Sequence, residues 1–385
     1  MGAAACCGKM AGHHEGSIAM PELPPFRADQ VGSLLRPAAL KDARRRHEAG
    51  ALDAAGLAAV EDREISRVIA KQQELGLRGI TDGELRRSWW HLDFLWGLDG
   101  IAEHHADFAI GFVGATPRTA GVRVDGKIGF SGHPMLEHYR FLHSHAGAVP
   151  KLTIPAPSAL LGRPVLPPID ARVYPQRDEL YADLGNAYRA AVSAFAAAGC
   201  RYLQLDEVFI AMLCDEKYRE KMVARGDDPD ALLHVYARLI NTAIADAPRD
   251  MTVTLHLCRG NFKSTYMGEG GYEVVEDVLF NEVDVDGYFM EYDDERSGGF
   301  EPLRLLPKGK RVALGLVTTK RGALESKDDL KRRIDAAAKF ADVDQLCLAP
   351  QCGFASTEEG NVLTEEEQWA KLERIVAVAE QVWEA

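Results

Sequence analysis

The sequence lacks any run of roughly 20 apolar residues, the length that a helix needs to cross a bilayer. Its longest alanine-rich segment, Ala190–Ala198, is too short for this purpose. We therefore predict no association with a membrane. Residues 1–25 also lack the apolar stretch of a signal peptide and any helical or strand periodicity, so we predict that they form a flexible leader.

Positive charge is also scarce, because 45 lysines and arginines face 58 aspartates and glutamates, for a net charge of -13. Proteins that bind nucleic acid usually carry a clustered basic face, and this composition argues against such a partner. The one basic run, Arg44–Arg46, lies in a mixed-charge helical pattern. We interpret it as the solvated face of a helix.

Cysteine is sparse, with seven residues spread through a chain of 385. A secreted disulfide framework packs an even number of cysteines into a short chain, so we predict free thiols in a reducing compartment, the cytoplasm. Cys200, Cys214 and Cys347 lie in apolar surroundings and are predicted to be buried. The sequence does not fix the oligomeric state, and a homo-oligomer remains open.

Short β-rich runs alternate with longer helical patterns after the leader. The predicted strands are Arg27–Gly32, Leu77–Thr81, Lys151–Ile154, Arg201–Leu205, Thr252–His256, Gly287–Glu291, Arg311–Leu316 and Gln345–Ala349. The strongest predicted helices are Asp53–Leu75, Arg177–Ala198, Glu216–Ala247, Lys327–Ala341 and Thr364–Trp383. Alternation of this kind predicts parallel strands joined by crossover helices, and eight strands predict an α/β fold closed as a (β/α)8 TIM barrel.

One region interrupts this alternation. Between Gly111 and Gly132 the residues alternate in polarity and glycines mark turns, most clearly over Thr119–Phe130. This pattern predicts a β-hairpin inserted between the second and third units of the barrel. Because no linker or internal repeat divides the rest, residues 26–385 are predicted to form a single catalytic barrel.

Chemically capable side chains fall just past the ends of the predicted strands. They are Ser33, Asp82, Glu84, Asp206, Glu207, His256, Cys258, Glu291, Lys320 and Cys352. In a (β/α)8 barrel the carboxyl ends of all strands meet at one face, where the active sites of such enzymes lie. Residues that are far apart in the chain are therefore predicted to share one pocket.

A metal site is the sharpest prediction. His256 and Cys258 are two residues apart, so in an extended segment both side chains point to the same side. Cys352 lies before Gly353, where a glycine permits a sharp turn and close backbone approach. A histidine with two cysteines suits zinc and leaves a position for substrate. The plainer alternative is a core histidine beside a buried cysteine.

Glu291 is the natural fourth ligand, which an incoming thiol could displace. Zinc stabilises a thiolate, so a substrate thiol with an ordinary pKa near 8.5 would become a nucleophile at neutral pH. The predicted partners are therefore a small-molecule thiol and an electrophile that it attacks.

The chain resembles the catalytic barrel of cobalamin-independent methionine synthase, in particular the short single-barrel members of that family. The resemblance runs from about Phe26 to Trp383. It rests on the motifs Val31–Ser33, Thr81–Glu84, Gln204–Glu207, His256–Cys258, Met290–Glu291 and Pro350–Gly353.

The resemblance implies that His256, Cys258, Glu291 and Cys352 bind Zn²⁺. It also implies that Ser33, Glu84 and Asp206 hold an amino-acid thiol, with the two acidic groups facing its ammonium. For Asp206 and Glu207 the structural alternative is an ion-pair network at the barrel rim.

Three features depart from the long members of the family. The second, amino-terminal barrel of those enzymes is not expected here. Where they carry an acidic folate-contact segment, this chain has Arg86–His91, and where they carry a proton-relay histidine it has Lys320. Trp89 and Trp90 could stack on a flat methyl donor, or they could pack a lid over the barrel mouth. His91 is a candidate general acid or base, or it could only pack that lid. Lys320 could stabilise negative charge on a leaving group, or it could be exposed on the surface.

The leading prediction is zinc-dependent methyl transfer to homocysteine, from a methyl-folate or another small methyl donor, giving methionine. A second interpretation keeps the thiol and changes the electrophile, as in enzymes in which zinc-bound coenzyme M opens an epoxide. A third is a non-catalytic zinc- or thiol-binding protein. A metal-free decarboxylase on a similar barrel is disfavoured, because it needs no His-x-Cys motif.

Overall fold

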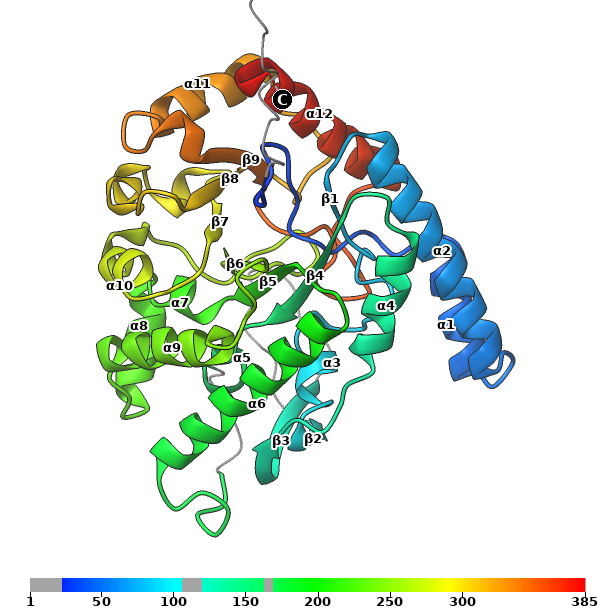
Figure 1. Cartoon of the computed structure of the whole chain (residues 1–385), viewed down its shortest axis with the longest axis vertical. Helices are drawn as coiled ribbons and strands as arrows, with labels where there is room; N and C mark the ends of the chain where they lie inside the picture. The colour runs from blue at the N-terminus through cyan, green and yellow to red at the C-terminus, as the bar shows by residue number, and fades with distance from the viewer. Residues whose placement is uncertain (1–22, 106–119, 163–168, 385) are drawn as a thin grey trace, which may run out of the picture.

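A computed structural model describes residues 23–105, 120–162 and 169–384 as an α/β barrel. Seven parallel strands form one curled sheet at the centre, with helices around it (Figure 1). In spatial order the strands are β1 (Gly79–Ile80), β4 (Val149–Pro155), β5 (Tyr202–Glu207), β6 (Thr252–Leu257), β7 (Gly287–Glu291), β8 (Arg311–Val317) and β9 (Leu346–Pro350). The barrel prediction is confirmed.

The α-helices lie outside the sheet and connect its strands. Their bounds are α1 (Ala38–Glu48), α2 (Ala54–Glu74), α3 (Leu92–Leu95), α4 (Met135–His145), α5 (Ser158–Leu161), α6 (Arg177–Ala197), α7 (Phe209–Met212), α8 (Glu216–Ala224), α9 (Pro229–Ile244), α10 (Glu276–Asn281), α11 (Lys327–Ala337) and α12 (Glu365–Trp383). Short 3₁₀ turns are η1 (Tyr272–Val274), η2 (Glu295–Ser297), η3 (Glu301–Leu305) and η4 (Val343–Gln345). In the part of the chain that the structure describes, no helix is long and apolar enough to cross a membrane.

The predicted first strand, Arg27–Gly32, is not a regular strand. It makes a single parallel bridge, between Ala28 and Leu348 of β9. The physical reason is that the Asp29 carboxylate accepts hydrogen bonds from the backbone N–H groups of Phe26 and Gln30, at 3.0 and 2.7 Å. A side chain thus takes the place of a neighbouring strand as hydrogen-bond partner, and this irregular segment lies against β9 at the open edge of the sheet.

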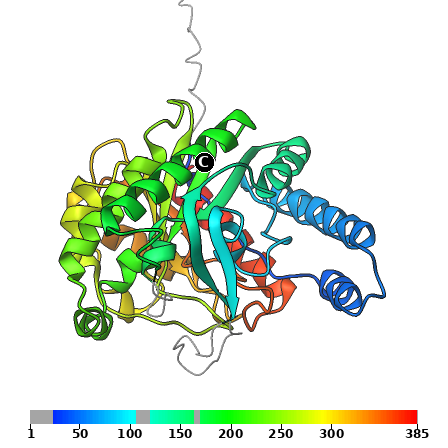
Figure 2. The same cartoon turned by 90° about the horizontal axis from the view of Figure 1, so that it is seen from below.

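A two-stranded antiparallel sheet lies outside the barrel, between the second and third predicted strands in the sequence. Its strands are β2 (Asp99–His105) and β3 (Ala120–Gly129), and Figures 1 and 2 show them beside α3 and α6. The sequence placed both strands within residues 111–132. Only β3 lies there, and its partner β2 precedes that range. Residues 106–119 and residues 1–22 of the predicted leader lie outside the described residues.

The long helix predicted from Glu216 to Ala247 is divided in two. Gly226 has φ of 85°, which ends α8, and Asp228 begins α9 by accepting from the N–H groups of Asp230 and Ala231. Pro229 occupies the first position of α9, where its missing N–H group costs nothing. The Asp-Pro pair was therefore a stronger signal than the continuous apolar periodicity.

The apolar core has two parts. A small cluster inside the barrel comprises Val31, Phe289, Ala313, Cys347 and Ala349. A much larger cluster packs the outer faces of the strands against the helices. All strands of the central sheet pair in parallel, so the segments that follow β1, β5, β6 and β9 meet at one face of the molecule.

Candidate metal and thiol site

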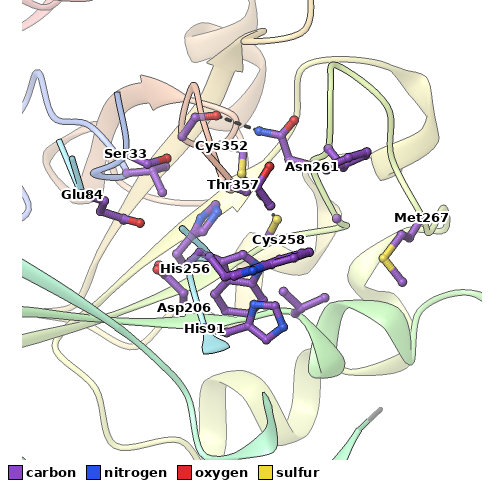
Figure 3. Close-up of a pocket in the computed structure, with 18 of the residues that line it drawn as sticks. Ser33, Glu84, His91, Asp206, His256, Cys258, Asn261, Met267, Cys352 and Thr357 are labelled. Carbon is purple, nitrogen blue, oxygen red and sulfur yellow. Dashed lines mark hydrogen bonds between the residues drawn. The ribbon is translucent and has the colours of Figure 1, made fainter. Parts of the chain in front are cut away.

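Three ligand-type side chains converge at this face. His256 in β6, Cys258 just after it and Cys352 after β9 are all buried, and their ligand atoms lie within 4.8 Å of one another. Figure 3 shows the three side chains pointing toward one another. The Sγ atoms of Cys258 and Cys352 are 3.4 Å apart, and neither ring nitrogen of His256 has a hydrogen-bond partner among the described residues. Two sulfurs and a bare imidazole fit the donor set of zinc.

The contact between the two cysteine sulfurs shifts their pKa values in opposite directions. The contact with Cys258 lowers the pKa of Cys352 well below its ordinary value, despite burial. The same contact, together with burial, raises the pKa of Cys258 well above its ordinary value. The site therefore favours one thiolate even before any cation is considered, and a thiolate is the form that binds a metal.

The segment after β9 is held close to the start of the barrel. A Cβ atom on Gly353 would lie 1.9 Å from Oγ of Ser33, so a larger residue would force the Ser33 side chain to move. The carbonyl of Gly353 accepts from Nδ2 of Asn261 at 2.7 Å, as Figure 3 shows, and the N–H of Phe354 donates to the carbonyl of Ser33 at 2.9 Å. Cys352 is thereby positioned by both the β6 loop and the Ser33 segment.

Two carboxylates and a hydroxyl lie beside the three ligands. Asp206 of β5 pairs in register with His256 of β6, so both side chains point to the same side of the sheet. Burial raises the pKa of Asp206 to about 7, and Glu84 contributes in the same direction. Ser33, Glu84 and Asp206 line one pocket together with the three ligands.

Glu84 is held in an unfavourable backbone conformation. Its φ is 57°, a region that residues other than glycine rarely occupy. Asp82 accepts from its N–H at 2.8 Å, Thr153 donates to its Oε1 at 2.8 Å, and Arg87 lies 3.4 Å from its Oε2. Surrounding groups thus fix a conformation that would otherwise cost about 1 kcal/mol or more, and this places the carboxylate at the pocket.

The tryptophan segment after β1 forms another part of the pocket. Asp93 accepts from the N–H of Trp89 at 2.8 Å, and the N–H of Trp90 donates to the carbonyl of Ser356 at 2.9 Å. The His91 ring lies on the Trp90 ring, with centroids 4.3 Å apart and planes tilted by 31°. Trp89, Trp90 and His91 all line the pocket.

The pocket brings together most of the residues that the sequence singled out. They are Ser33, Glu84, Trp89, Trp90, His91, Asp206, His256, Cys258 and Cys352. Glu207, Glu291 and Lys320 do not line it. Lys320 donates to Asp293 at 2.6 Å and its side chain is 13% exposed, so it is neither in the pocket nor fully exposed.

Glu291 is buried close behind the three ligands. Its Oε1 accepts from the N–H of Arg259 at 2.8 Å, and its Oε2 accepts from Arg296 at 2.9 Å. It is not part of the group whose ligand atoms lie within 4.8 Å of one another. Both of its carboxylate oxygens accept hydrogen bonds, so binding a metal would require one oxygen to give up its hydrogen bond.

Glu207 faces away from the pocket, because neighbouring residues of a strand point to opposite sides. Its Oε1 accepts from the N–H groups of Phe209 and Ile210 at 2.7 and 2.9 Å, and Ser158 donates to its Oε2. The carboxylate thus joins β5 to α5 and α7. The sequence could not separate Asp206 from Glu207, since both follow the same strand.

Burial raises the pKa of Glu207 to about 7. Between the ordinary glutamate pKa and pH 7 the folded state binds more protons than the unfolded state, so this group's contribution to stability falls as pH rises through that window. We expect Glu207→Gln to remove a pH-dependent penalty of roughly 3 kcal/mol above pH 7. Urea unfolding at pH 5 and pH 8 measures the free energy of unfolding of both proteins. If this free energy changed with pH equally in the variant and the wild type, the account would be contradicted.

Several pocket residues gave no recognisable signal in the sequence. They are Val208, Phe209, Asn261, Phe262, Met267 and Thr357. Val208 and Phe209 follow Glu207 directly, and Asn261 follows the His256–Cys258 motif, so proximity to a predicted strand end was the available clue. Cys200, Cys214 and Cys347 are buried, as predicted, and none of the three forms a disulfide with another described residue.

A family model described as the catalytic domain of cobalamin-independent synthase matches residues 26–381. The chain belongs to this family. It is accordingly a methionine-synthase-like catalytic domain from a family of methyltransferases, and the resemblance noted in the sequence is confirmed.

The relatives differ in length. The Bacillus subtilis protein YxjG is 51% identical over 94% of this chain and 95% of its own length. A solved structure from Listeria monocytogenes, described as a candidate vitamin-B12-independent methionine synthase, is 36% identical with a TM-score of 0.76, covering 94% of this chain and 99% of that one. A 5-methyltetrahydropteroyltriglutamate–homocysteine methyltransferase of Synechococcus is 22% identical over 94% of this chain and only 44% of that enzyme.

Proposed function

We propose that this protein is a zinc-dependent methyltransferase that methylates a small thiol, with homocysteine as acceptor and methionine as product. The observation that carries the proposal is the convergence of His256, Cys258 and Cys352 in a pocket that also holds Ser33, Glu84 and Asp206. A zinc ion held by the first three would stabilise the thiolate of the substrate. Glu291 is the candidate fourth ligand, provided that its carboxylate exchanges a hydrogen bond.

The other three residues suit the amino-acid end of homocysteine. Its ammonium needs negative charge, which Asp206 and Glu84 supply from buried positions. Its carboxylate needs donors, and Ser33 offers a hydroxyl and backbone beside Cys352. Fixing both ends of a zwitterion orients its sulfur toward the ligands and reduces the entropy lost on reaction.

The test uses purified protein. We expect about one zinc per chain by mass spectrometry and methionine formation from homocysteine with a methyl donor, and we expect the gene to rescue a methionine auxotroph. Parallel assays with coenzyme M and an epoxide test the second interpretation. Zinc binding without turnover and without rescue would instead favour a non-catalytic thiol-binding protein.

A further inference from the structure

The part of the pocket that the amino acid does not use is aromatic. We call Trp89, Trp90, Phe209 and Phe262 the aromatic wall. Figure 3 places Met267 on the opposite side of the view from Ser33 and Glu84, so the pocket extends well past the amino-acid groups. Trp89 is only 6% exposed, and its backbone bridges to Thr357, so this part of the wall is held by the segment after β9.

The charges that reach the pocket are acidic. Glu84 and Asp206 line it, and among the described residues no lysine or arginine does. A donor with an anionic portion would therefore meet no lysine or arginine among the described residues that line the pocket. A cation, by contrast, is attracted by the faces of tryptophan rings and by nearby carboxylates.

The leaving group poses a second requirement. An amine that gives up a methyl group as a neutral molecule needs a proton from an acid. Lys320 is held by Asp293 at 2.6 Å and does not line the pocket. The carboxyl groups that do line it, Asp206 and Glu84, are the proposed partners of the substrate ammonium, and the His91 ring packs on Trp90. A donor whose leaving group departs neutral without protonation fits this arrangement better.

We propose that the methyl donor is a methylsulfonium cation bound against the aromatic wall. This inference rests on the proposed methyl transfer to homocysteine and names its donor class. The thiolate sulfur forms the new bond to the methyl carbon with its own electron pair. The old carbon–sulfur bond breaks with its pair going to the departing sulfur, which leaves as a neutral thioether. The protein supplies no proton and no electron.

The test uses the zinc-loaded enzyme with homocysteine and three methyl donors. They are trimethylsulfonium, tetramethylammonium and 5-methyltetrahydropteroyltriglutamate. We expect trimethylsulfonium to give methionine and dimethyl sulfide in equal amounts, at a kcat/KM above those of the other two. Tetramethylammonium tests whether the enzyme requires a sulfonium rather than any methylated cation, because it has the same charge but a poorer leaving group.

A binding measurement provides a readout that does not depend on turnover. Calorimetry without thiol should detect trimethylsulfonium but not tert-butanol, a neutral molecule of similar size. Trp90→Leu should weaken trimethylsulfonium binding about tenfold, because it removes an aromatic face, and Trp90→Phe should restore most of the affinity. The KM for homocysteine should be unchanged in both variants.

The outcomes separate this inference from the proposed function. Faster methylation by the folate donor would overturn the proposal of a sulfonium donor, but it would agree with the proposed methyltransferase activity. Equal turnover of trimethylsulfonium and tetramethylammonium would overturn the claim that the donor is a sulfonium rather than an ammonium. Homocysteine binding with no reaction from trimethylsulfonium would also overturn the inference, whereas failure to bind homocysteine would overturn the proposed function itself.

Discussion

His256→Ala is expected to abolish stoichiometric zinc binding and to lower kcat/KM for thiol methylation by ~10³-fold. Catalytic zinc sites use three protein ligands, and this change would leave only Cys258 and Cys352 from the group within 4.8 Å. Both nitrogens of His256 lack other partners among the described residues, so the imidazole has no other hydrogen-bonding role there that its loss would disturb. Metal analysis and steady-state kinetics measure the two effects.

Cys352→Ala should reproduce these losses, and Cys347→Ala is its matched control. Cys347 is a buried cysteine of the same strand region, in β9, but it belongs to the apolar cluster inside the barrel. We expect Cys347→Ala to keep its zinc and its activity. If it lost zinc while Cys352→Ala retained it, the proposed ligand set would be wrong.

Asp206→Asn is expected to raise the KM for homocysteine on the order of 10²-fold while zinc content stays unchanged. The substitution preserves size, and Oδ1 can still accept from Gln204, which donates at 2.7 Å. What disappears is the negative charge that the substrate ammonium would face in a buried site. Initial-rate kinetics over a range of homocysteine concentrations measure the change.

Glu207→Gln offers the matched comparison, because it makes the same chemical change on the opposite side of the same strand. Its carboxylate contacts Phe209, Ile210 and Ser158 rather than the pocket. We expect no change in the KM for homocysteine. A large rise in KM for Glu207→Gln, with none for Asp206→Asn, would reassign the ammonium partner.

Much of the site could be predicted from spacing. His256 and Cys258 are two apart on a strand end, and the periodicity of a strand then places both on one side. Glycine at 353 predicted close backbone approach, and a Cβ atom at this position would overlap the Ser33 hydroxyl. These are local properties of the chain, which is why the sequence was sufficient for them.

Other assignments depended on partners distant in the sequence. Lys320 was a candidate for the pocket until Asp293 proved to hold it, and Glu291 was a candidate ligand whose oxygens also contact Arg259 and Arg296. The segment Arg27–Gly32 had the composition of a strand, but the Asp29 side chain accepts from the backbone N–H groups of Phe26 and Gln30. Composition cannot reveal which of several partners a polar group selects.

The sequence by itself determined the alternation of strands and helices, the family, and the residue types gathered at the carboxyl ends of the strands. Only the tertiary structure decided which of these side chains meet. It showed that Asp206 faces the pocket while Glu207 faces away, and that Lys320 does not line the pocket. It also added an aromatic wall from the connections after β1, β5 and β6. The reason is that periodicity is set by neighbouring residues, whereas contact between side chains depends on register and packing across the whole barrel.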